Sequence, residues 1–271
     1  MKNDFTIIDS HCHVYPDKIA AKASQSISVF YDNCPVQYNG SLGELLTAGA
    51  DAGVDYFVVQ SVATNPGYVA SINRYIAEAV GHSGGRLIGL GALHPDSADI
   101  AGDVQNIKEL GLKGVKLHAD IQQIAINDPR CYKIYEILEA EGLPVLMHTG
   151  DFRYKFSNPE NLIPVLNTFK KLTVVGAHYG GWSVWEEAAQ KLAHYENLYV
   201  DTSSTFGFTG LDFIRTLLTK YDTHRVLFGV DYPMWNLKTE LDALFSLKLS
   251  KADYQKILCE NCARVYGLNI N

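Results

Sequence analysis

The sequence lacks the features that mark nucleic-acid-binding and membrane proteins. It has no basic run longer than Lys170-Lys171, and its 30 aspartates and glutamates outnumber 23 lysines and arginines. Binding to phosphate backbones requires clustered lysine and arginine, so the net charge of −7 argues against a nucleic-acid partner. No apolar stretch approaches the length that a membrane-spanning helix needs, so we expect no membrane partner.

Cysteine is also scarce. The five cysteines are an odd number and lie far apart, and Met1-Lys2-Asn3-Asp4 does not resemble a signal peptide. We therefore expect a reducing, cytoplasmic location. Cys259 and Cys262 have the spacing of a redox or zinc pair. However, they fall inside a predicted amphipathic helix and no second pair exists, so we interpret the spacing as an accident of the helix.

What the sequence does contain is a regular alternation of short apolar runs and helical patterns. Eight apolar runs are each followed by a helical pattern: 5–8, 56–60, 87–93, 114–118, 144–148, 172–178, 198–201 and 225–231. Near-continuous apolar runs are typical of parallel strands that are covered on both faces. The pattern predicts an α/β protein, a single (β/α)₈ TIM-barrel domain over residues 1–271. An open doubly wound sheet is the alternative, but it would need a glycine-rich first turn.

Several boundaries carry their own signals. Residues 41–44 and 183–186 match the capping-box pattern, and the first of these helices should end near Gly53. Pro129 should begin a helix that Gly142 ends. Residues 14–40 are predicted to be a long, irregular connection, and connections of that length usually form a lid or a pocket wall.

Two histidines follow the first predicted strand. Side chains alternate along a strand, so His11 and His13 should point to the same side and Cys12 to the other. Two adjacent imidazoles at a strand end are well placed to bind a divalent metal ion from one side.

Other polar residues gather at the same positions in later strands. Six of the nine histidines fall at the C-terminal ends of predicted strands: His11, His13, His94, His118, His148 and His178. Asp201 and Asp231 close the seventh and eighth strands. In a barrel these ends meet at one mouth, where barrel enzymes carry their catalytic residues. The sequence therefore predicts a metal site there.

On these motifs the chain resembles the amidohydrolase superfamily, specifically the amidohydrolase-related branch that contains aminocarboxymuconate semialdehyde decarboxylase-like enzymes. The resemblance runs nearly from end to end. The segments that carry it are residues 8–13, 86–91, 111–117, 142–148, 177–181, 226–233 and 261–266.

The resemblance implies that His11, His13, His148 and Asp231 hold one divalent metal ion, usually zinc. It makes His178 the general acid/base or an electrophile. Asp231 would also accept a proton from the activated water. The simpler interpretations are a core histidine for His148 and a hydrogen-bonding carboxylate beside the metal site for Asp231. Pyrone-dicarboxylate lactonases of the same group keep similar residues and act without a metal.

Further residues are candidates for binding substrate. Lys116 is near the position of the carboxylated lysine of binuclear amidohydrolases, but we favour hydrogen bonding in the lumen or an electrostatic role. Asp201 would orient a ligand or bind substrate, and Arg153 has the fork geometry that suits a carboxylate. Residues that could line the pocket, each with a purely structural alternative, are His94, His118, Tyr15, Trp182 and Trp235.

The expected function is hydrolysis of a C–N or C–O bond in a small amide, lactam, ester or lactone. The alternative is non-oxidative decarboxylation of a small unsaturated or aromatic acid. A TatD-like deoxyribonuclease has a similar opening motif, but it would need a glutamate where this chain has Lys116-Leu117-His118. The expected partner is a small molecule, with a carboxylate as a candidate group, and a homodimer is the candidate assembly.

Overall fold

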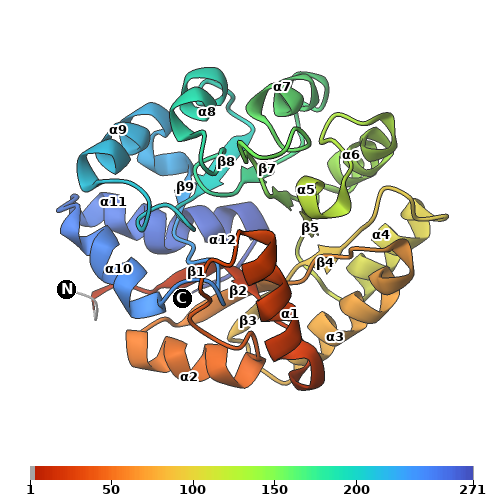
Figure 1. Cartoon of the computed structure of the whole chain (residues 1–271), viewed down its shortest axis with the longest axis horizontal. Coiled ribbons are helices and arrows are strands. Elements are labelled where there is room, and N and C mark those ends of the chain that lie inside the picture. Colours follow the sequence, from red (N-terminus) through yellow and green to blue (C-terminus); the bar gives the residue numbers. More distant parts are fainter. Residues whose placement is uncertain (1–3, 271) are drawn as a thin grey trace.

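Parallel strands form the centre of the molecule, and helices surround them (Figure 1). The computed structural model describes residues 4–270. Every strand pair is parallel. The strands are β1 Ile8–His13, β2 Tyr56–Gln60, β3 Leu87–Gly89, β4 Gly91–Ala92, β5 Val115–Leu117, β6 Val145–Met147, β7 Val174–Gly176, β8 Leu198–Asp201 and β9 Val226–Leu227. This arrangement confirms the predicted (β/α)₈ TIM barrel.

The first, third and eighth predicted strands differ from expectation. The first is expected over residues 5–8, but β1 begins at Ile8 and continues to His13, so both histidines lie within the strand. The third is divided at Leu90, whose N–H bonds to Val59, while Gly91 bonds to Gly114 on the other side. Its two halves, β3 and β4, therefore join the two sheets into one wall. The eighth is shorter than predicted, because the chain leaves regular strand geometry after Leu227. It still closes the barrel through the hydrogen bond from Ser10 N to Phe228 O, at 2.9 Å.

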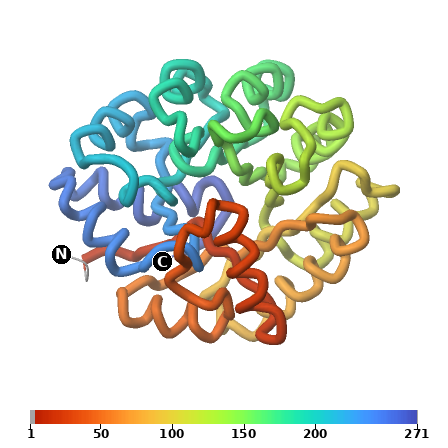
Figure 2. Tube along the Cα trace, in the orientation of Figure 1, coloured from red at the N-terminus to blue at the C-terminus, as the bar shows by residue number. Residues whose placement is uncertain are grey.

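Helices follow the strands in chain order around the barrel, and the last of them lie beside the first strand (Figure 2). The longer helices are α1 Asp17–Phe30, α2 Leu42–Ala52, α3 Val69–Gly81, α4 Ile100–Glu109, α6 Pro129–Glu141, α7 Pro159–Thr168, α8 Trp185–Leu192, α9 Leu211–Tyr221 and α10 Leu237–Ser246. The shorter ones are η2 Pro66–Tyr68, α5 Ala119–Gln122, η3 Thr223–Arg225, α11 Lys251–Gln255, the π-helical turn η4 Lys256–Glu260 and α12 Asn261–Tyr266. No helix in the described range is both long and apolar enough to cross a membrane.

Two of the predicted helix boundaries are confirmed. The Ser41 hydroxyl accepts a hydrogen bond from the Glu44 N–H, and α2 ends at Gly53 with a left-handed φ of 80°. Pro129 begins α6, and Gly142 ends it with a φ of 65°. Glycine favours both C-terminal positions because it has no Cβ to clash in that conformation.

Two other local predictions are wrong. Residues 183–186 form no capping box, because the Ser183 hydroxyl accepts from the Phe152 N–H instead and α8 has no side-chain cap. Residues 14–40 are not irregular throughout, since α1 occupies Asp17–Phe30. The buried side of α1 consists of the small residues Ala20, Ser24 and Ser28, which give little apolar periodicity to detect.

The barrel interior changes from apolar to polar along its axis. Alternate strand residues point inward, so Ile8, Val58, Leu146, Val175 and Leu227 share one inner cluster with Cys262 and Tyr266 of α12. The cysteines are free, and Cys262 is a buried apolar contact, which agrees with an accidental spacing of Cys259 and Cys262. At the other end, where the strands finish, the inward-facing residues are polar and charged. The apolar base therefore supports a polar mouth.

Candidate active site

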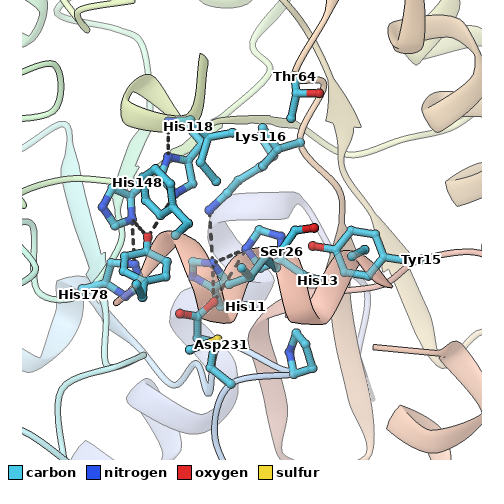
Figure 3. A pocket seen from close by; sticks show the side chains of 18 residues that line it. His11, His13, Tyr15, Ser26, Thr64, Lys116, His118, His148, His178 and Asp231 are labelled. Atoms are coloured by element: carbon cyan, nitrogen blue, oxygen red, sulfur yellow. Dashed lines mark hydrogen bonds and ion pairs between the residues drawn. The ribbon is translucent and has the colours of Figure 1, made fainter. Parts of the chain in front are cut away.

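Three side chains at the mouth bring their ligand atoms together. His11 and His13 come from β1, and their Nε2 atoms are 3.2 Å apart. Asp231 Oδ1 lies 3.4 Å from the first and 3.6 Å from the second. Ligands held about 2.1 Å from a tetrahedral metal ion are separated by about 3.4 Å. The three residues therefore fit a divalent metal ion, and Figure 3 shows them facing a common point.

Asp201 fixes the orientation of His11. It is fully buried, and its Oδ2 accepts a hydrogen bond from His11 Nδ1 at 2.9 Å. A proton on Nδ1 leaves the lone pair of Nε2 directed at His13 and Asp231. This contact is compatible with the first of the two predicted roles for Asp201, the orientation of a ligand, which stays a prediction. Asp201 is not among the residues that line the described cavities.

Lys116 enters the same site from β5. Its Nζ lies 3.1 Å from His11 Nε2, and the side chain is buried (Figure 3). Burial lowers the pKa of Lys116 to about 8, so the amine is still mostly protonated at neutral pH. The geometry agrees with the predicted lumen hydrogen bond and electrostatic role.

His148 lies beside the three-residue group rather than in it. Its Nδ1 is 3.1 Å from His178 Nε2, and its ring stacks on that of His118 at 4.1 Å. Its buried Nε2 lies 3.6 Å from Asp120 and has no hydrogen-bond partner among the described residues. The structure thus assembles three of the four predicted ligands, and His148 remains a predicted ligand at the adjacent wall.

His178, at the end of β7, has a defined protonation pattern. Its Nδ1 donates to Ser203 O at 3.1 Å, while its backbone N–H donates to Asp201 Oδ1 at 3.0 Å. Burial lowers the pKa of His178 to about 4, so the ring is neutral at pH 7. With the proton on Nδ1, the Nε2 atom is a proton acceptor that faces the cavity.

The cavity has two parts that meet at these residues. The larger part, of about 250 Å³, is lined by the site residues, by Tyr15 and by Ile27 and Phe30 of α1. The smaller part, of about 130 Å³, is lined by Trp182, Phe208 and Trp235. The residues common to both parts are Tyr31, His148, His178, Asp231 and Met234. The predicted pocket-lining positions of Tyr15, Trp182 and Trp235 are thus observed, and α1 forms a wall.

Three other candidates differ in their surroundings. His118 lines the larger part, and its Nδ1 caps α5 by accepting from the Ile121 N–H. His94 is not among the residues that line the cavity, and its Nδ1 accepts a hydrogen bond from the Asp96 N–H. Arg153 also lies outside the cavity lining. Its guanidinium is bound to Asp151 and Asp32, so it is not free to bind a substrate carboxylate.

Four residues that complete the site, Tyr31, Asp120, Ser203 and Ser204, were not predicted from the sequence. Tyr31 follows α1, and its hydroxyl lies 3.2 Å from His118 Nε2. Asp120 faces His148, and the Ser204 hydroxyl donates to Asp231 Oδ2 at 2.6 Å. Ser203 lies between His11 and His178. Asp120 and the two serines come within three residues of a strand-end histidine or aspartate, which is a signal that sequence reading could use. Tyr31 has no such signal.

Comparison with known proteins agrees with this fold. A family model described as Amidohydrolase matches residues 8–268. A 2-amino-3-carboxymuconate-6-semialdehyde decarboxylase from Dictyostelium discoideum is 28% identical over 99 residues. That match covers 35% of this chain and only 27% of the relative's length.

Solved structures resemble the whole chain at low sequence identity. The 5-carboxyvanillate decarboxylase from Sphingomonas paucimobilis has a TM-score of 0.77 and 17% identity, covering 98% of this chain and 100% of the other. A putative 2-pyrone-4,6-dicarboxylic acid hydrolase from Pseudomonas putida has a TM-score of 0.70 and 20% identity, covering 98% and 99%. At these identities the likeness establishes the fold.

Proposed function

Because the chain belongs to the amidohydrolase family, we propose that it is a metal-dependent hydrolase that cleaves a C–N or C–O bond in a small amide, lactam, ester or lactone. The observation that carries this proposal is the position of His178. Its unprotonated Nε2 faces the cavity and lies 3.1 Å from the predicted ligand His148, beside the group of His11, His13 and Asp231. A proton acceptor beside a metal site is the arrangement that hydrolysis by water needs.

The proposed ligands are His11, His13, Asp231 and His148. Zinc is the proposed metal, because imidazole nitrogens and one carboxylate form a donor set that it favours. When bound, the ion would supply Lewis acidity to an oxygen atom in the cavity. Asp201 would keep His11 in the tautomer that binds metal, since its Oδ2 takes the proton of Nδ1.

The remaining residues would bind substrate and move protons. His178 would accept a proton at Nε2 and then return it to the leaving group. The Lys116 ammonium would hold an anionic or carbonyl oxygen of the substrate, since it is the cation that lines the cavity. The apolar face of α1 would keep bulk water out, because Ala23 and Ile27 line the same cavity.

Decarboxylation of a small carboxylic acid is the second candidate. It is supported by the same Lys116, since an ammonium in an otherwise largely apolar cavity would hold a substrate carboxylate. It is also supported by the activities named for two of the proteins that this chain resembles. A deoxyribonuclease is not proposed, because Lys116 takes the place of the required glutamate. A cytoplasmic location and a homodimer stay predictions.

The deciding experiment combines metal analysis with a substrate screen. We expect about one equivalent of divalent metal per chain. The screen covers lactones, small amides and aromatic carboxylic acids, and measures carbon dioxide separately from released acid. Acid release without carbon dioxide supports the hydrolase, and carbon dioxide release supports the second candidate. Full activity of metal-free protein would overturn both metal-dependent mechanisms.

Replacement of His178 tests the proton-transfer role. We expect His178→Asn to lower turnover by about 10²–10⁴-fold, the usual contribution of a general acid or base, while metal content is retained. The matched control is His194→Asn, which changes an exposed histidine and should leave turnover unchanged. Loss of metal from His178→Asn would instead make His178 a ligand.

A further inference from the structure

Tyr31 occupies the boundary between the two parts of the cavity. It directly follows α1, which runs from the rim of the molecule, between α2 and α3, to the centre of the barrel (Figure 1). Its side chain lines both parts. Its hydroxyl is 3.2 Å from His118 Nε2 and 3.5 Å from His148 Nδ1. A polar group at this boundary would touch any substrate that extends from one part into the other.

The hydrogen bonds around His118 set the direction in which Tyr31 donates. His118 Nδ1 accepts from the backbone N–H of Ile121 at 3.3 Å, so the proton of the neutral ring is on Nε2. That Nε2–H therefore donates to the Tyr31 oxygen. Because His178 Nε2 is unprotonated, His148 Nδ1 donates to it and cannot accept from Tyr31. The phenolic proton of Tyr31 is therefore left to be donated to a ligand in the cavity. Tyr31 is thus a hydrogen-bond donor directed into the cavity.

Arg153 holds the end of α1 that carries Tyr31. Its Nη1 donates to the Phe30 carbonyl and to Asp32, both at 2.8 Å, and its Nη2 donates to Asp151 at 2.7 Å. The guanidinium also lies 5.0 Å from the centre of the Tyr31 ring. This arrangement ties α1 to the loop after β6. Arg153 is therefore a positioning residue for Tyr31.

The geometry points to Tyr31 as a substrate-binding residue that donates a hydrogen bond to a carboxylate oxygen of a small acid with a flat apolar body. Tyr31 and Lys116 are donors that line the same cavity, and two donors suit the two oxygens of a carboxylate. The walls that would receive the apolar body include Ile27, Val62 and Met234. This inference rests on the proposed function only in taking the cavity as the substrate site.

Binding of benzoate tests the role of Tyr31 without requiring turnover. Trp182 and Trp235 line the smaller part, so tryptophan fluorescence should report binding, with calorimetry as an independent measurement. We expect Tyr31→Phe to weaken benzoate binding about tenfold, the effect of one hydrogen bond to a charged group. The matched control is Tyr38→Phe, which also loses one hydroxyl contact, to Asn236, but lies outside both parts of the cavity. This control should bind like wild type.

The outcomes separate this inference from the proposed function. The role of Tyr31 would be overturned if Tyr31→Phe and wild type bind benzoate with equal affinity and have the same melting temperature. It would also be overturned if the wild-type protein binds no benzoate at millimolar concentration. Tyr31-dependent binding without turnover of any screened compound would support the inference and count against the proposed function. If a screened compound is turned over and Tyr31→Phe leaves its kcat/KM unchanged, the result would support the proposed function and count against the role of Tyr31.

Discussion

The buried Asp201 carboxylate orients several groups of this site through its hydrogen bonds. One oxygen accepts the Nδ1 proton of His11, and the other accepts the backbone N–H groups of His178 and Ser203. It therefore joins the proposed metal site to His178, the proposed proton acceptor. An asparagine of nearly the same shape could keep the two backbone contacts but would present its NH₂ group to His11.

We expect Asp201→Asn to lower zinc affinity by about 10–100-fold with little change in fold. The amide would favour the His11 tautomer with its proton on Nε2, which removes the lone pair that faces the metal site. Competition with a chelating dye measures the affinity. Asp253→Asn changes a carboxylate near the C-terminal helices and serves as the control. Wild-type affinity in Asp201→Asn would contradict the assigned tautomer.

Glu240 is a second buried carboxyl group, on α10. Its Oε2 has no partner among the described residues. Burial, with smaller contributions from the charges of Asp9 and Asp231, raises its pKa to about 8. The unfolded chain ionises this group near pH 4.3, so folding keeps a proton on it between about pH 4 and 8. Stability contributed by this group is therefore lost as pH rises through that range.

We expect Glu240→Gln to melt at a higher temperature than wild type, with a gain that grows from pH 5 to pH 8. Glutamine resembles the protonated acid and does not ionise, so it avoids the loss at higher pH. Melting temperatures at pH 5, 6, 7 and 8 provide the measurement. The exposed Glu136→Gln on α6 is the control. A gain that is constant or shrinks with pH would refute the assignment.

At the scale of elements, α2 packs unusually close to β2, because a glycine stands at the point of contact. Gly49 faces β2, and a Cβ at this position would come within 2.1 Å of the Phe57 ring. Gly43, in the first turn of the same helix, has open space around its Cα. Substitution of each glycine by alanine therefore distinguishes the effect of packing from the effect of helix propensity within one helix.

Gly49→Ala should destabilise the protein by about 1–3 kcal/mol, because the added methyl forces the helix away from the strand or the Phe57 ring out of place. Gly43→Ala should be neutral or stabilising by up to about 1 kcal/mol, since alanine is the better helix former. Denaturant unfolding of both variants measures the difference. Equal effects would mean that α2 tolerates movement over β2.

At the scale of the whole molecule, the mouth of the barrel draws its residues from distant parts of the chain. His11 and Lys116 lie in β1 and β5, and His148 and Asp231 follow β6 and β9. Their side chains meet only after the barrel closes. Bringing several neutral imidazoles and an ammonium together has a desolvation cost, which lowers the pKa values of His11 and Lys116. Coordination of a cation by the nitrogens of His11 and His13 and by Asp231 would compensate the part of this cost that falls on the histidines.

Metal binding should therefore stabilise the folded protein. At a free zinc concentration about 1,000 times Kd the gain is about 4 kcal/mol, which corresponds to a rise in Tm on the order of 8 °C for a chain of this size. Melting curves with chelator and with added zinc measure it. Asp231→Asn should reduce the rise, and His194→Asn should not. An unchanged Tm in wild type would count against a metal that belongs to the folded state.

The sequence alone was sufficient to predict the barrel, the positions of most strands and the polar residues near their C-terminal ends. It could do so because apolar runs, capping residues and the period of a strand are local properties that act over a few residues. His11 and His13 were predictable as a pair for the same reason. By contrast, the interruption at Leu90 depends on hydrogen bonds to two different neighbouring strands, and the small residues on the buried side of α1 hid that helix.

Which polar residues come into contact could be seen only in the folded structure. Arg153 suited a substrate carboxylate by its chemistry, but Asp151 and Asp32 bind it, and Asp32 lies 121 residues earlier in the chain. Tyr31 reaches the site because α1 folds over the barrel, and His148 stands beside the other predicted ligands because it stacks on His118. Contacts between residues far apart in sequence depend on how the barrel closes, so they cannot be predicted from local sequence patterns.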